Sequence, residues 1–311
     1  MEDIENELKQ EFDFLNNFQH ISYKEKIVRA YDELTSTDPN KIMKRGREEW
    51  DNMLWGIYWG KIYVIWANTW VWKTTFVNQI CNNVSNQWYR VAKYSLEDRI
   101  EDIWKEEIFY TVNRLMWKAG KKPIDWISFV NNTSFDEIKE YVYRACEMLI
   151  EKNNLVELDK KKNVNIDEMI RLMEEEIEKG TKLFAIDHLH YFDMPDSKER
   201  HDIQIQNVMH RINELARKNN IAVILVAHYR KWSNNDYPDY DEFKDGSAIK
   251  QVANIIIQIT RDFDWDTSKF HITKIRWPIK PKVLETTFNL STFEYGFKKS
   301  ERQLKSDKVV V

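Results

Sequence analysis

Glycine is unusually rare in this chain. It occurs 7 times in 311 residues, whereas an average composition of roughly 7% would give about 22. Tryptophan is correspondingly abundant, with 13 copies. Because glycine is the residue that adopts positive φ and allows close backbone approach, so few glycines leave the chain short of residues for tight turns and ligand-binding loops.

Several tryptophans stand where chain geometry asks for glycine, namely Trp55, Trp59, Trp66, Trp70, Trp72, Trp88 and Trp277. We hypothesise that the gene uses UGA for glycine, as some bacterial lineages do, and that the printed translation reads this codon as tryptophan. The alternative is a protein genuinely rich in tryptophan, whose indoles fill core and surface grooves. UGG codons at positions 66, 70 and 72 would exclude the first interpretation.

Cysteine is scarce, and long apolar runs and a strong charge imbalance are absent from the sequence. The two cysteines, Cys81 and Cys146, form no CxxC pair, so we expect no structural zinc and a reducing compartment. The acidic start MEDIENELKQ has no signal-peptide layout and no apolar run approaches 18 residues, which predicts a cytoplasmic protein without a membrane segment. A net charge of -4 argues against a uniformly basic nucleic-acid coat but allows a local basic lining in an oligomer.

Short apolar runs of β type alternate with helical stretches through most of the chain. They are residues 62–65, 91–94, 183–186, 222–226 and 254–259. Such alternation predicts βαβ units and a mostly parallel twisted sheet flanked by helices, an α/β fold. The helix expected at 201–218 has one apolar face, which should pack on the sheet. Later extended pieces at 270–274, 284–288 and 293–297 predict antiparallel strands at the C-terminal end.

The predicted domain organisation is simple. Residues 1–45 show apolar residues at helical spacing and are read as a short appendage of two helices. Residues 46–299 form the main domain, and residues 300–311 a disordered tail. The charged stretch 151–182 is expected to be a solvated helix and loop.

The segment Ala67 to Thr75, ANTWVWKTT, fits the phosphate-loop pattern G/AxxxxGK[ST], with Trp72 in the place of glycine. In such a loop the backbone N–H groups turn inward around the phosphates. An expected strand before it and an expected helix after it supply the required context. As printed, indoles at 70 and 72 would fill the anion cradle, so a non-binding loop is the alternative if they are real. The candidate nucleotide-binding residues are Ala67, Asn68, Thr69, Trp70, Val71, Trp72, Lys73, Thr74 and Thr75.

Two carboxylates follow other expected strands. Asp187 ends the run LFAID, where a carboxylate at the sheet's carboxyl edge can hold the water shell of Mg²⁺. Glu97 follows the short strand at 91–94, where it could orient and deprotonate an attacking water. The alternative for Glu97 is an acidic residue at a helix start, because Ser95 precedes it.

Further polar residues lie near later strand ends. His228 follows the strand at 222–226 and could sense a γ-phosphate. A lone histidine is more often a capped or exposed residue, but the position at a strand end favours the functional interpretation. Lys274 and Arg276 are one residue apart on an extended segment, so both can reach into a neighbouring subunit's site. Arg261 is another candidate, and surface strands often carry such cations.

With glycine at the suspect positions, residues 50–75 read WDNMLGGIYGGKIYVIGANTGVGKTT, which resembles the RecA-type P-loop NTPase domain of DnaB-like hexameric replicative helicases. The segments YSLED, LFAIDHL, VILVAHYRK, DGSAIKQVANIIIQITR and TKIRWPIKP follow in the family's order, so the resemblance covers about residues 45–297. It implies that Lys73 binds the β- and γ-phosphates and that Thr74 binds Mg²⁺. Asp187 would be the second residue of the Mg²⁺ shell, and Glu97 would be the catalytic base. His228 would sense the γ-phosphate, and Arg276, with Lys274, would be the finger supplied in trans.

The resemblance implies an ATP- and Mg²⁺-dependent helicase motor that forms a homo-hexamer and translocates on single-stranded DNA in replication. The loop from 231 to 250 would contact the DNA, although the acidic residues within 234–245 depart from the usual basic loop. A primase or a helicase loader is a possible partner, but the chain has no room for the family's N-terminal helical domain. The alternatives are a RecA/RadA- or KaiC-like ATPase, or a non-catalytic scaffold if the loop tryptophans are real.

Overall fold

The computed structural model divides the chain into two units, Met1–Lys41 and Ile42–Val311. It describes residues 28, 42–43, 56–67, 73–96, 99–131, 135–152, 154–158, 165–189, 192, 201–228, 246–262, 267–275, 282–289 and 294–296. Apart from these, the appendage expected at 1–45 and the tail expected at 300–311 lie outside the described residues. Except for residue 28, the described residues all belong to the second unit.

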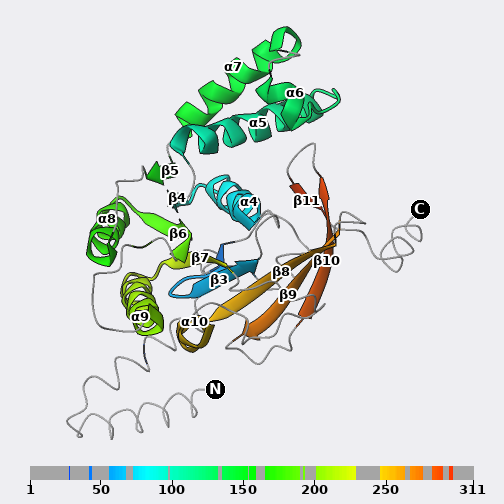
Figure 1. The fold of residues 1–311 in the computed structure, drawn as a ribbon. Helices are drawn as coiled ribbons and strands as arrows, with labels where there is room; N and C mark the ends of the chain where they lie inside the picture. The colour runs from blue at the N-terminus through cyan, green and yellow to red at the C-terminus, as the bar shows by residue number, and fades with distance from the viewer. Residues whose placement is uncertain are drawn as a thin grey trace, which may run out of the picture. The chain divides into compact units, whose positions relative to one another are not determined.

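One large sheet organises this unit (Figure 1). Among the described residues its nine strands run in the order β11-β10-β9-β8-β3-β7-β6-β4-β5. Their bounds are β3 Ile62–Ala67, β4 Arg90–Ser95, β5 Leu155–Leu158, β6 Thr181–Asp187, β7 Ala222–His228, β8 Ile255–Asp262, β9 Thr267–Ile275, β10 Lys282–Asn289 and β11 Glu294–Gly296. Strands β8, β3, β7, β6, β4 and β5 are parallel, whereas β9, β10 and β11 pair antiparallel. Both the parallel sheet and its antiparallel end are as predicted. A separate pair, β1 (Ile42–Met43) and β2 (Ile57–Tyr58), is antiparallel.

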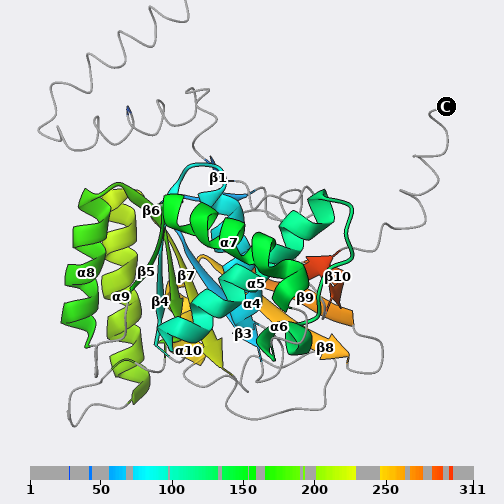
Figure 2. The same ribbon diagram turned by 90° about the horizontal axis from the view of Figure 1, so that it is seen from above.

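Helices cover both faces of the sheet, as the two views in Figures 1 and 2 show. They are α4 Lys73–Ser85, α5 Ile100–Lys118, α6 Trp126–Val130, α7 Phe135–Glu151, α8 Ile166–Glu178, α9 His201–Asn219 and α10 Gly246–Val252. Helices α4, α5 and α7 contribute to one apolar core, and α8, α9 and α10 contribute to the other. None of the helices in the described part of the chain is both long and apolar enough to span a membrane.

Strand β3 shows why these residues form a central strand. Its side chains alternate between the two cores, with Ile65 in one and Val64 in the other. Every residue of β3 is buried, which is the pattern of a parallel strand covered on both faces. Helix α9 buries Ile205, Met209 and Ile212 in the second core, so the predicted apolar face of this helix packs on the sheet as expected.

The stretch 151–182 differs from its prediction. Residues 155–158 form β5, which extends the sheet beside β4, whereas a solvated helix and loop were expected. Helix α8 is not fully solvated either, because Met169 and Met173 are buried. Because the segment is highly charged, the apolar face of α8 was not recognised from its helical spacing. Strand β5 is too short to be identified by periodicity.

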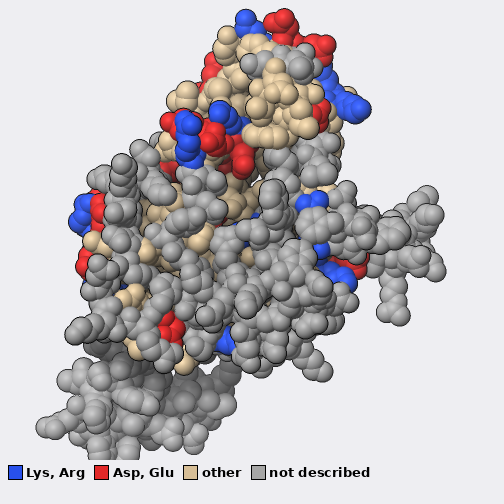
Figure 3. Space-filling model, viewed as in Figure 1, with Lys and Arg blue, Asp and Glu red and all other residues tan. Residues whose placement is uncertain are grey.

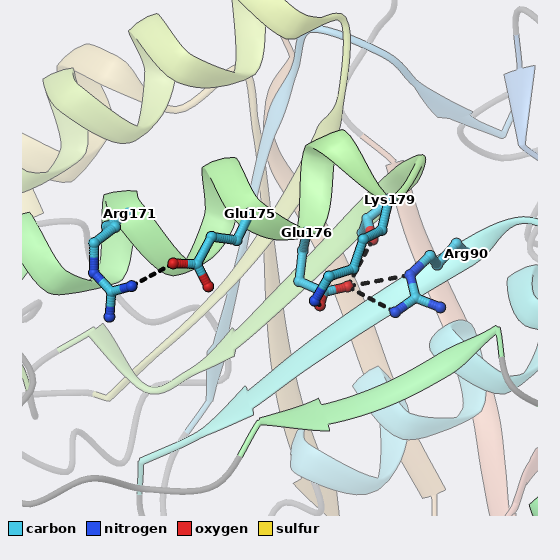
Figure 4. A network of polar contacts seen from close by, with 6 residues as sticks. Arg90, Arg171, Glu175, Glu176 and Lys179 are labelled. Carbon is cyan, nitrogen blue, oxygen red and sulfur yellow. Dashed lines mark hydrogen bonds and ion pairs between the residues drawn. The ribbon is translucent and has the colours of Figure 1, made fainter.

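Polar contacts clamp α8 to the amino end of β4 (Figure 4). The Glu176 carboxylate accepts from Arg90 Nε at 3.1 Å and Nη2 at 3.0 Å, from Lys179 Nζ at 2.7 Å and from Thr181 Oγ1 at 3.2 Å. Its side chain is 4% exposed. Burial opposes ionisation of Glu176, but the hydrogen bonds from Lys179 and Arg90 outweigh it and hold its pKa below the ordinary value. This carboxylate therefore joins β4, α8 and β6.

Three of the suspect tryptophans are among the described residues. Trp88 has φ of 70° and is 90% exposed, which is the conformation and exposure typical of a glycine after a helix. Trp59 lies edge-on to Tyr89, and among the described residues its buried Nε1 has no hydrogen-bond partner. Trp66 is fully buried in β3. The conformation of Trp88 favours the recoding hypothesis, whereas Trp66 fits the core as printed, so the hypothesis stays a prediction for codon analysis.

Candidate active site at the carboxyl edge of the sheet

The phosphate-loop candidate lies between a strand and a helix, as its pattern requires. Ala67 is the last residue of β3, and α4 begins at Lys73. Lys73 and Thr75 are buried at 7% and 8% exposure, and the first turn of α4 has no acidic residue. A helix N-terminus with free N–H groups and no nearby carboxylate in its own first turn attracts anions. Residues 68–72, including both tryptophans of the loop, lie outside the described residues.

Thr74 and Asp187, which are 113 positions apart, meet directly. The Thr74 hydroxyl donates to Oδ2 of Asp187 at 2.5 Å. Asp187 is the last residue of β6 and is 6% exposed. Mg²⁺ prefers oxygen ligands and is commonly held by one or two carboxylates together with substrate phosphates. A hydroxyl and a carboxylate in contact beside a phosphate loop therefore fit Mg²⁺.

Strand pairing brings the backbone of His228 to the same edge. In the parallel register Ala67 lies opposite His228, the last residue of β7, and Ser95 lies opposite Asp187. The side chain of His228 is outside the described part of the molecule. Its backbone position places it between the phosphate loop and β6, which is where a γ-phosphate sensor is expected.

Glu97 is also outside the described residues. The nearest described residues before and after it, Leu96 and Arg99, show where the chain leaves β4 and where α5 begins. Leu96 N donates to the backbone oxygen of Asp187 at 2.5 Å, so the chain leaves β4 beside Asp187. Helix α5 begins only at Ile100, with Arg99 as its N-cap. Because Glu97 itself is not among the described residues, both interpretations of it, a catalytic base and an acid at a helix start, stay predictions.

Lys274 lies away from this edge in its own chain. A register shift between β8 and β9 occurs at Ile256/Ile257, and beyond it Lys274 Nζ donates to the backbone oxygen of Lys250 in the last turn of α10. Bulges of this kind re-aim side chains. Arg276 is outside the described residues. The in-trans role of both cations stays a prediction.

Arg261 is on β8, two residues beyond Ile259, which pairs with Ala67. Its guanidinium lies 5.7 Å from the ring centroid of Phe288. This contact places Arg261 at the carboxyl edge but directs it toward β10. Its role at the nucleotide stays a prediction.

The face seen in Figure 3 has Lys and Arg interspersed with Asp and Glu over α5–α7. On α5, for example, Lys105 pairs with Asp102 at 2.9 Å. Mixed charges of this kind do not form the basic stripe typical of a nucleic-acid surface. A loop at 231–250 is expected to contact DNA. Its residues 231–245 lie outside the described residues, and residues 246–250 belong to α10.

Sequence reasoning missed one buried polar cluster close to this edge. Lys93 of β4 meets Glu107 of α5 and Glu157 of β5. The one signal in the sequence was a lysine inside the apolar strand VAKYS, because a charge in a strand buried on both faces needs partners.

Comparisons with known proteins identify the family. The sequence matches the DnaB-like helicase C terminal domain family over residues 43–282, well over half of the chain. A solved ATPase domain is similar with a TM-score of 0.74 at 19% identity, over 89% of this chain and 98% of that one. A DnaB-like replicative helicase, studied with its interactions with primase, is similar with a TM-score of 0.73 at 19% identity, over 88% of this chain and 66% of that one. No curated protein sequence matches.

At 19% identity the two structures establish the RecA-like fold, and the family match establishes the kind of domain. The alternatives of a recombination or regulatory ATPase gain no support from these matches. This chain belongs to the family of DnaB-like helicase C-terminal domains, which are helicase motor ATPases.

Proposed function

We propose that this chain hydrolyses ATP in a Mg²⁺-dependent reaction and uses it to move along single-stranded DNA during replication. The observation that carries the proposal is the contact between the Thr74 hydroxyl and Asp187 at 2.5 Å. It joins the helix that follows the phosphate loop to the end of a buried strand. Such a pair is what a nucleotide site needs to hold a metal against the β- and γ-phosphates.

Each predicted residue at this edge has a separate role in the in-line attack of water on the γ-phosphate. The Lys73 ammonium binds the β- and γ-phosphates and stabilises charge on the transferring group. Glu97 orients the attacking water and accepts its proton. The oxygens of Thr74 and Asp187, directly or through the metal's water shell, would hold Mg²⁺, which would neutralise part of the phosphate charge. His228 senses whether the γ-phosphate is present.

The remaining predictions concern the oligomer, the DNA and other partners. In a ring hexamer Arg276, assisted by Lys274, reaches the nucleotide of the next subunit, and Arg261 is a further nucleotide contact from its own strand. The loop 231–250 faces the central channel and binds single-stranded DNA through its backbone. A primase or a loader is the expected protein partner, and the cytoplasm the expected location.

The test is DNA-stimulated ATP hydrolysis by the full chain. Lys73→Ala removes the phosphate-binding ammonium and should abolish stimulated turnover, because an electrostatic contact to the transferring group contributes about 10²–10³ in rate or more. Lys118→Ala is the control, since Lys118 is exposed at the end of α5. Unchanged turnover in Lys73→Ala would defeat the site assignment.

ATP titration separates the enzyme from the scaffold alternative. A protein that carries tryptophan at 70 and 72 and has no ATP affinity would be a non-catalytic scaffold. A protein that carries glycine there and binds ATP with Mg²⁺ would be the motor.

A further inference from the structure

Helix α10 ends in a carbonyl whose usual hydrogen-bond donor is engaged elsewhere. In a continuing helix the backbone oxygen of Lys250 would accept from the N–H of Asn254, four residues later. That N–H instead donates to the backbone oxygen of Ile62 on β3 at 3.0 Å, and Asn254 Oδ1 accepts from Ile62 N at 2.9 Å. The chain therefore turns from α10 into the sheet at this point, and the oxygen of Lys250 needs another donor.

Lys274 supplies that donor from β9. Its Nζ donates to the backbone oxygen of Lys250, 24 positions earlier in the chain. The register between β8 and β9 shifts at Ile256/Ile257, and Lys274 is the partner of Ile256 at this shift. Such irregularities re-aim side chains, and a cation at the carboxyl end of a helix also meets the negative end of its dipole. Lys274 is thus the C-terminal cap of α10.

Helix α10 depends on tertiary contacts of this kind because it is short. It has seven residues, and isolated helices of about two turns are not stable in water. Ile249 and Val252 are buried in the second core at 0% and 3% exposure. On the exposed side Gln206 Nε2 of α9 donates to Gln251 Oε1 at 2.9 Å, where α10 lies beside α9 (Figure 1). These contacts fix the face that α10 turns to the core, and the cap fixes its carboxyl end.

The place of α10 in the chain indicates what the cap controls. Residues 246–250 belong both to α10 and to the segment 231–250 that is proposed to contact single-stranded DNA. After α10 the chain enters β8, which pairs with β3, the strand that leads to the phosphate loop. Helix α10 therefore connects the proposed DNA segment to the sheet, and Lys274 holds the end of this connection.

We infer that Lys274 is a positioning residue for the DNA-contacting segment, because it fixes the carboxyl end of α10 on β9 and thereby residues 246–250. The inference rests on the proposed function, since that function gives the segment its ligand. It adds a role within one chain to the role across the subunit interface that is proposed for the same ammonium beside Arg276. The two roles predict different changes when the ammonium is removed.

The strength of the cap sets the size of the expected effect. For a half-buried lysine, the helix dipole and the hydrogen bond from a charged donor together favour the capped form by about threefold to tenfold. The apparent affinity of a ligand falls with the population of the conformation that binds it. Loss of the cap should therefore weaken DNA binding by no more than the same factor.

Three variants of the full chain test the inference. Lys274→Met keeps the length of the side chain and removes the ammonium, whereas Lys274→Arg keeps a charged donor at the same position. The matched control is Lys269→Met, which removes an exposed lysine from the same strand. Amide hydrogen exchange of residues 251–254 is measured without DNA or nucleotide. Affinity for a labelled oligo(dT) strand is measured by fluorescence anisotropy, and ATP hydrolysis is followed over a range of DNA concentrations.

In Lys274→Met, exchange at 251–254 should accelerate about threefold to tenfold. The affinity for oligo(dT) and the DNA concentration that gives half-maximal hydrolysis should weaken by up to the same factor. Lys274→Arg should restore most of both, which a defect caused by lost packing of the lysine stem would not require. Lys269→Met should change neither.

The inference is wrong if Lys274→Met has the exchange and the oligo(dT) affinity of Lys269→Met, and a lower kcat at saturating DNA would then assign Lys274 to the subunit interface alone. Faster exchange with unchanged affinity would also overturn it, because the cap would then be purely structural. If the unmutated protein does not bind oligo(dT), the proposed function fails and the inference falls with it. That failure is seen in the unmutated protein, before any variant is compared.

Discussion

Replacing Thr74 by valine is the sharpest perturbation of the candidate site, because it removes one hydroxyl and keeps the shape of the side chain. The lost contact is the 2.5 Å hydrogen bond to Asp187, a carboxylate with 6% exposure. Hydrogen bonds to charged groups contribute about 1.5–3 kcal/mol. For a domain of this size the melting temperature shifts by roughly 2–4 °C per kcal/mol. Without nucleotide, Thr74→Val should therefore melt about 3–12 °C below the unmutated protein.

The second consequence is the loss of the response to Mg²⁺ and ATP. A ligand at one hundred times its Kd stabilises the folded state by about 2.7 kcal/mol. The unmutated protein should gain that protection from ATP only when Mg²⁺ is present. Thr74→Val should gain much less, because it lacks the hydroxyl oxygen that we propose as a metal ligand. Its kcat should fall about 100-fold, which corresponds to about 2.7 kcal/mol of lost transition-state stabilisation.

Thr286→Val is the matched control. Thr286 is 1% exposed in β10 and its hydroxyl donates to the backbone oxygen of Ser268 at 3.3 Å, so the control also removes a buried hydroxyl. It should lose about 0.5–1.5 kcal/mol of stability and keep full turnover and Mg²⁺-dependent protection. Scanning calorimetry with and without Mg²⁺ and ATP measures the protection. If Thr74→Val matched Thr286→Val in both protection and turnover, the metal-site assignment would be wrong.

The remaining predictions concern the α8 clamp and the tryptophans. The pKa of Glu176 is depressed in the folded protein, so its stabilising contribution is present above the ordinary carboxyl pKa of about 4.3 and is lost as pH falls through the folded value. Denaturant titrations should therefore show a large stability difference between the unmutated protein and Glu176→Gln at pH 7 and a smaller one near pH 3, and a difference that grows on acidification would contradict the assignment. For the tryptophans we expect UGA codons at 66, 70 and 72 and glycine in the corresponding peptides by mass spectrometry, whereas UGG codons would end the hypothesis. Trp88→Gly in a protein that does carry Trp88 should raise stability by about 1 kcal/mol, because a non-glycine residue at φ of 70° is strained by roughly 1–2 kcal/mol.

Much of the fold could be predicted from the sequence because buried parallel strands read as continuous apolar runs. Strands β3, β4, β6, β7 and β8 contain the five predicted runs almost entirely. Helix α9 begins at His201, as predicted. The failures lie where local pattern carries little information. Strand β5 has only four residues, which lie inside a charged stretch. Helices α5, α6 and α7 lie between β4 and β5 in the chain, and no sequence motif indicates them.

The candidate site was predictable in part for a related reason. A phosphate loop, and a carboxylate after an apolar run, are local patterns, so Lys73, Thr74 and Asp187 could be named without a structure. Their proximity could be expected from the rule that parallel strands bring their carboxyl ends to one edge. The direct contact between Thr74 and Asp187 could not be read from the chain. Glu97 and Arg276 remain sequence predictions, because they lie outside the described residues.

The sequence by itself determined the order of the strands along the chain, the placement of the phosphate loop between strand and helix, and the family resemblance. It did so because apolar periodicity and loop motifs are properties of neighbouring residues. The tertiary structure decided which strands pair, that Lys274 turns toward α10 after a register shift, and that Lys93, Glu107 and Asn82 meet. Contacts between residues 14 to 113 positions apart depend on packing and register, and no local pattern encodes them.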